Sequence, residues 1–108
     1  MQDATSSSSA NQTFLAEDLI EKEQIGSLQF PQTDVLTNDQ ERRRRSHDIE
    51  RACTLGNVHH GKVHIHFQTA DGHHYRADTT IWACDSDYVT LKAGASLPVR
   101  AISQIEFI

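Results

Sequence analysis

The sequence predicts a mainly β fold in which one N-terminal α-helix precedes a small five-stranded β-barrel. Two observations lead to this fold class. From residue 57 onward, apolar side chains recur at every second position, which is the period of a strand with one buried face. The preceding stretch, residues 37–56, has the composition and the end signals of a helix. The 108 residues suffice for one small domain with an N-terminal tail.

Residues 1–36 are expected to form an acidic tail that is disordered or partly helical. They contain six acidic residues and one lysine, a net charge of −5. Within them, residues 13–25 have a narrow apolar face, with Thr13 as a possible helix cap and Gly26 as a stop. A helix of about three turns is marginally stable in isolation, so this stretch either docks on the barrel or frays.

Residues 37–56 are expected to form the main helix. Thr37 or Asn38 can cap its N-terminus, and the acidic residues that follow suit the positive end of the helix dipole. Gly56 is the expected C-terminal stop. Only the last two turns have an apolar face, so the first half should be solvated and the second half should pack on the barrel.

The region 57–108 is the expected barrel domain, with a net charge of about −1 from four basic and five acidic residues. Its five strands are expected at residues 61–70, 74–84, 87–93, 96–100 and 102–108. Pro98 cannot donate to a strand ladder, so the fourth strand should be short or at an edge.

The first two strands should form a hairpin around the Asp-Gly pair at residues 71–72. A two-residue turn would place Phe67 opposite Arg76 and bring charges onto the apolar face. A three-residue loop, residues 71–73, places Phe67 opposite Ala77 and keeps one face apolar, so this register is preferred. The core is then expected to contain Val63, Ile65, Phe67, Ala77, Ile81, Val89, Leu91, Leu97, Val99, Ile102, Ile105 and Phe107.

Residues 50–108 resemble a group of small bacterial proteins found mainly in Bacteroidetes genomes. The residues that carry the resemblance are "ACTLGN", "KVHIHFQTADG" and "TTIWACDSDYVTLKAGASLPVRAISQIEF". The group has the shared pattern "ALTLGN", "KV.I.F.T", "TTIWA", "VTLKGG" and "IPIR.I..I.F". This resemblance supports a domain boundary near the end of the helix and implies no activity.

At the level of the fold, one helix followed by five strands that end in "LPVRAISQIEF" resembles the SH3-like and Sm-like barrels. That plan implies three long, bent strands, a short fourth strand and a fifth that closes the barrel. In bacterial Sm-like RNA chaperones, a basic residue and a histidine near the last strand help to bind RNA. Arg100 stands in a comparable place here, but no histidine follows it. Barrels of this type also support many unrelated functions.

The only basic run consists of four arginines, Arg42, Arg43, Arg44 and Arg45. Four consecutive helical residues point in four directions and do not form a single stripe. The preferred interpretation is a solvated helix with ion pairs to carboxylates one turn away. The alternative is binding of single-stranded RNA through these arginines and Arg100.

His64 and His66 should point to one face of the first strand, with Asp78 directly across from His66. Two imidazoles and one carboxylate are a possible zinc-binding set. An exposed strand face also accepts polar residues that have no such role. A solvated face is therefore the preferred interpretation, a metal site at these residues is the alternative, and no cofactor is expected.

Trp82 should lie on the face opposite Ile81 and Ala83, where full exposure of a tryptophan would be unusual. The end of the helix is expected to cover it. Otherwise the strand bends and changes face, or Trp82 and Tyr88 mark an interface.

Cys53 and Cys84 are the only cysteines, and the spacing predicts two reduced thiols in a cytosolic protein. No apolar run approaches the roughly 20 residues that a membrane span needs. The N-terminus lacks the basic and apolar regions of a secretory signal. The expected location is therefore the cytoplasm, with no membrane partner.

Together, these features predict a non-enzymatic binding or assembly module whose partner is another protein or a second copy of the chain. The sequence contains no glycine-rich phosphate loop and no recognisable nucleophile–base pair. RNA binding through the arginines and metal binding through the histidines are the two alternatives.

Overall fold

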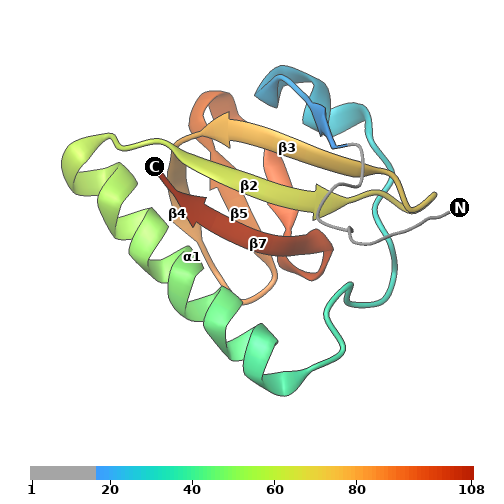
Figure 1. The fold of residues 1–108 in the computed structure, drawn as a ribbon. Helices are drawn as coiled ribbons and strands as arrows, with labels where there is room; N and C mark the ends of the chain where they lie inside the picture. The colour runs from blue at the N-terminus through green and yellow to red at the C-terminus, as the bar shows by residue number, and fades with distance from the viewer. Residues whose placement is uncertain (1–16) are drawn as a thin grey trace, which may run out of the picture.

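The computed structural model describes residues 17–108, which form one α-helix, three short 3₁₀ helices and seven strands (Figure 1). The helix is α1 (Asp39–His59). The strands are β1 (Asp18–Leu19), β2 (Val63–Gln68), β3 (His74–Thr79), β4 (Ile81–Cys84), β5 (Tyr88–Leu91), β6 (Ser96–Pro98) and β7 (Ile102–Phe107). The fold is therefore mainly β with one long helix, but the expected count of five strands is wrong.

The strands form two sheets, with the orders β1-β3-β2-β7 and β4-β5-β6. The expected strand 74–84 is divided between them, because β3 ends at Thr79 and β4 begins at Ile81. Thr79, Thr80 and Ile81 are all buried, so the alternation of inward and outward side chains breaks where the chain passes between the sheets. The described strands therefore form two sheets and not the closed barrel expected from the sequence.

The hairpin of β2 and β3 has a different register from the one expected. Phe67 lies opposite Tyr75, and Ile65 lies opposite Ala77, so the pairing is shifted by two residues. The reason is a longer connection, in which the Thr69 N–H donates to the His73 carbonyl (3.0 Å) and Gly72 adopts a positive φ of 85°. A shift of two residues keeps every side chain on its expected face.

The core contains nearly all the residues expected there. Of the twelve, only Phe107 is half-buried and the other eleven are buried. The core also includes Ile25, together with Ile49 and Ala52 from the half of the helix that was expected to pack on the barrel.

Residues 17–36, here called the N-terminal strap, pack against the sheets. The helix expected at 13–25 is not formed over its described part: residues 18–19 pair with β3, and a 3₁₀ helix spans Lys22–Ser27. Ile25 is fully buried in the core. The extended path allows backbone pairing with the β3 edge and burial of Ile25 together, which explains why it replaces a helix. The remainder of the expected tail, residues 1–16, lies outside the described residues.

Helix α1 lies along one side of the molecule, against β7 and β4 (Figure 1). The Asn38 side chain caps it, accepting from the N–H groups of Gln40 (2.8 Å) and Glu41 (3.1 Å). Gly56 is not its stop, because the helix continues to His59. A Cβ at Gly56 would lie 2.1 Å from the Ile81 carbonyl oxygen, so this glycine allows the helix to approach the backbone of β4.

Candidate functional site

The four consecutive arginines of α1 have different environments. Arg45 is buried, and its two terminal nitrogens contact the two carboxylate oxygens of Asp34 at 2.8 and 2.6 Å. Its Nη1 also donates to the Ile102 carbonyl at 2.9 Å. Arg43 and Arg44 are exposed. The basic run is therefore not a uniformly solvated helix face, because Arg45 is a structural residue that joins the strap, α1 and β7.

Two further arginines hold the same strap. Arg42 Nε donates to the Leu36 carbonyl at 2.8 Å, and Arg100 Nε donates to the Pro31 carbonyl at 2.6 Å. Of the five arginines proposed to contact RNA, three thus have intramolecular partners in the strap.

The charge of Asp34 is stabilised by this arrangement. Burial alone would raise its pKa, but the hydrogen bonds from Arg45 and from the Leu36 N–H (2.8 Å) outweigh burial and hold the pKa of the carboxyl below its ordinary value. Asp34 and Arg45 therefore form a charged, bidentate pair in the folded protein.

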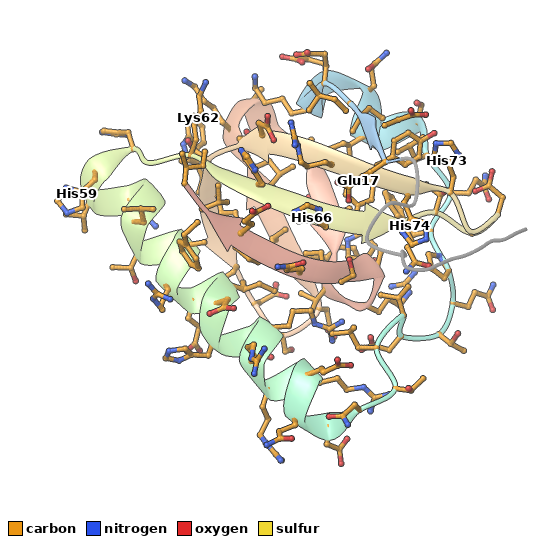
Figure 2. All side chains as sticks on the ribbon, viewed as in Figure 1. Glu17, His59, Lys62, His66, His73 and His74 are labelled. Carbon is orange, nitrogen blue, oxygen red and sulfur yellow. The ribbon has the colours of Figure 1, made fainter. Side chains whose placement is uncertain are left out.

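The histidines of β2 alternate with buried residues and so lie on the face of their sheet away from the core, as expected. Figure 2 labels one of them, His66. His66 lies between two carboxylates, with Nδ1 2.6 Å from Glu17 and Nε2 2.9 Å from Glu106. The hydrogen bond from His66 lowers the pKa of Glu106. At the hairpin end, His73 Nε2 lies 2.7 Å from Asp18. Two histidines thus contact the first residues of the strap.

The expected metal set is not assembled as predicted. Asp78 lies across from His64 and not from His66. Its carboxylate is 3.0 Å from Arg76 Nε and 3.7 Å from His64 Nε2. Among residues 17–108, no group of three or more histidine, cysteine or acidic side chains has an arrangement that could hold a metal ion.

Trp82 and Tyr88 are the large aromatic side chains of the second sheet, and each is 47 % exposed. The expected cover of Trp82 by the end of the helix is therefore wrong. The pairing of β4 with β5 shifts between Ile81 and Ala83, and this irregularity leaves both Trp82 and Ala83 exposed. Tyr88 follows a turn in which the Asp85 carboxylate accepts from its N–H (2.8 Å), and such backbone donors lower the pKa of Asp85.

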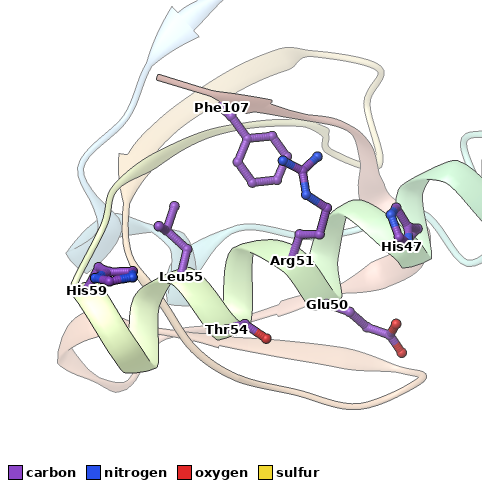
Figure 3. A pocket seen from close by; sticks show the side chains of 7 residues that line it. All are labelled: His47, Glu50, Arg51, Thr54, Leu55, His59 and Phe107. Atoms are coloured by element: carbon purple, nitrogen blue, oxygen red, sulfur yellow. The ribbon is translucent and has the colours of Figure 1, made fainter.

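A groove of about 450 Å³ lies between α1 and the end of β7 (Figure 3). Arg51 extends from the helix over the ring of Phe107, with its guanidinium carbon 4.3 Å from the ring centre. His47 and His59 also line the groove, but they are twelve positions apart along the helix, which corresponds to about 18 Å. These two imidazoles therefore cannot act on one reacting atom.

The sequence did not identify the carboxylates that pair with the candidate residues. Asp34 and Glu17 belong to a segment expected to be a tail, and no local pattern links them to Arg45 or His66. The position of Glu106 could have been predicted in part, because alternation in the last strand places it on the face opposite Ile105. Pairing of β7 with β2 then brings Glu106 beside the β2 histidines.

Comparisons of the chain with protein-family models, with curated protein sequences and with solved structures found no match. Within residues 17–108, no helix has the combination of length and apolar character that crossing a membrane requires.

Proposed function

We propose that the chain is a non-enzymatic assembly module built on an SH3-like or Sm-like plan. Support for the plan comes from the order of elements: a helix, a hairpin whose second strand continues into the other sheet at Thr80, a short β6, and a β7 that returns to β2. Pro98 at the end of β6 fits the short fourth strand of that plan.

The proposal rests on the exposed side chains of Trp82 and Tyr88. These two residues are here called the aromatic face. Along β5, Val89 and Leu91 are buried, whereas Tyr88 points away from the core. Large aromatic side chains are enriched at the centres of protein interfaces, where their burial contributes much of the affinity. Two of them on one small sheet favour contact with another protein surface.

The proposed assembly is a homo-oligomer in which the aromatic face of one copy packs against another copy. Residues 57–108, which contain both residues of the aromatic face, carry a net charge of only about −1, whereas most of the chain's net charge of −5 lies in the N-terminal segment. The RNA alternative has weaker support, because Arg42, Arg45 and Arg100 are engaged within the chain. The metal alternative is weakened by the carboxylate and arginine partners of its three residues.

Light-scattering mass across a concentration series tests this proposal. The wild-type mass should rise above that of the 12.1 kDa chain, and Trp82→Ala with Tyr88→Ala should return it to a monomer. Leu19→Ala is the matched control, because Leu19 is a 59 % exposed apolar residue on the other sheet. A monomeric wild type at every concentration, or an oligomer unaffected by the double variant, would rule out assembly through this face.

A further inference from the structure

We infer that Cys53 and Cys84 form a dithiol site that a neutral low-molecular-weight disulfide converts into an intramolecular disulfide between α1 and β4. This inference is independent of the assembly proposal. It concerns the only two cysteines of the chain, which lie 31 positions apart in sequence. In the described structure, neither of them is part of a disulfide.

The close approach of α1 to β4 brings the two cysteines together. Gly56 contacts the backbone at Ile81, since a Cβ at Gly56 would lie 2.1 Å from the Ile81 oxygen. Cys53 lies one helical turn before Gly56, on the same side of α1. Cys84 lies three residues after Ile81.

The two elements run in opposite directions, so both cysteines lie on the same side of that contact. Ile49 and Glu50, from earlier in the helix, line one cavity together with Cys84 and Asp85, from the end of the strand. Cys53 lies between Ile49 and Gly56 along α1. Ala52 and Cys53 are the helix residues on this side between the two contacts, and Ala52 is buried in the core whereas Cys53 is half-buried, with Cys84 at the strand end nearby.

Contacts of the Asn57 side chain place the Cys53 sulfur at this junction. Asn57 Nδ2 lies 3.6 Å from Cys53 Sγ and 3.3 Å from the Trp82 carbonyl oxygen. The Asn57 side chain therefore connects the helix turn that holds Cys53 to β4, at a point two residues before Cys84. Both thiols are half-buried and pack on the core. A small oxidant can therefore reach them, whereas a second protein chain has less access.

The surroundings of Cys84 disfavour its thiolate form. Burial, and then the contact with the Cys53 thiol, raises the pKa of Cys84 to about 11, and the charges of Glu50 and Asp85 act in the same direction. Cys84 therefore stays protonated at neutral pH and is a poor first nucleophile. The same two carboxylates disfavour an anionic oxidant, which is why a neutral disulfide is the expected reactant.

The reaction is an ordinary thiol–disulfide exchange. The Cys53 thiolate attacks one sulfur of the reagent RSSR, forms a mixed disulfide and releases RS⁻. Cys84 then loses its proton and attacks the Cys53 sulfur, which expels the second RS⁻. In sum, two protein thiols and one RSSR give one protein disulfide and two RSH, so the protein loses two electrons and two protons to the reagent.

The test exposes the reduced full chain to 2-hydroxyethyl disulfide and follows its intact mass. The native protein should lose the mass of two hydrogen atoms and both titratable thiols, without a lasting adduct. Cys84→Ser should instead stop at one stable mixed disulfide on Cys53. The yield of internal disulfide relative to adduct should fall by at least about tenfold in urea, because the fold supplies the effective concentration.

A second readout concerns stability. The oxidised protein should melt about 10 °C above the reduced protein, and dithiothreitol should reverse the increase, because the cross-link closes a loop of some thirty residues. Lasting adducts on both cysteines of the native protein, a covalent dimer, or no reaction within hours would each overturn the inference.

Discussion

At the scale of single residues, the arginine run shows how a local pattern can hide several roles. Arg42 and Arg45 lie three positions apart and share the helix side that faces the strap, whereas Arg43 and Arg44 point to solvent. The sequence predicted the helix that holds them. It could not predict that Arg45 is buried, because its partner Asp34 lies eleven positions away in a segment without a periodic pattern.

Substitution of Arg45 by methionine is expected to destabilise the protein by about 3 kcal/mol. It removes both hydrogen bonds to the half-buried Asp34 carboxylate and the donor to the Ile102 carbonyl, which leaves a charge without its main partner. Urea denaturation measures the change. Arg44→Met, an exposed change on the same helix, should stay within about 0.5 kcal/mol of the wild type. Equal effects of the two substitutions would contradict a structural role for Arg45.

The histidines of the candidate site show the same limit of prediction from local sequence. Alternation correctly placed His64 and His66 on the outer face of β2. Their actual neighbours, Glu17 and Glu106, depend on where the strap and β7 run, and only tertiary structure determines those paths. Residue types therefore predicted the face, and chain topology determined which groups meet there.

At the scale of elements, the strands were predicted well and the strap was not. Each expected strand overlaps an observed one, because alternation of buried and exposed residues is a strong local signal. The apolar residues of 13–25 suggested a helix. A two-residue strand and one buried isoleucine determine the observed path instead, and neither produces a periodic pattern.

Ile25→Ala is expected to reduce stability by about 2–4 kcal/mol, because it removes a fully buried side chain and leaves a cavity in the core. Thermal and urea unfolding measure the loss. Leu19→Ala serves as the control within the same strap, since that side chain is 59 % exposed and should change stability by less than about 0.5 kcal/mol. If Ile25→Ala were as mild as the control, the strap would not belong to the core.

At the scale of the whole molecule, alternation predicted a mainly β fold but not the division into two sheets. A strand that leaves one sheet for another keeps its local composition, so the stretch 74–84 read as one strand. In the structure, Thr79, Thr80 and Ile81 are buried in succession, and this breaks the period of two at the crossing. Because two of these three residues are threonines, the sequence does not show the break.

Acid is expected to destabilise the protein. The pKa of Asp34 is lowered by its partners, and those of Asp71, Asp85 and Glu106 are lowered as well. A carboxyl whose pKa is lower in the folded state stabilises the fold at pH values above its ordinary pKa of about 4. This stabilisation is lost as the pH falls through the pKa of the carboxyl in the folded state. The urea midpoint should therefore be flat from pH 7 to about pH 5 and fall below pH 4.

Asp34→Asn provides the control for this pH dependence. Because Asp34 is the most buried of these four carboxyls, its neutral replacement should flatten the acid limb of the urea midpoint while lowering the midpoint at pH 7. If the urea midpoint of the variant fell below pH 4 as steeply as that of the wild type, the pH dependence would come from the exposed carboxylates.

The strap also bears on the order in which the chain folds. Its 3₁₀ helix packs on β6, so this contact joins segments about 70 residues apart. Contacts over such separations cost more loop-closure entropy than the hairpins do and are made late. We therefore expect the sheets and α1 to meet around an incomplete core, which closes when Ile25 enters. Weakening the strap should then accelerate unfolding and leave the folding rate almost unchanged.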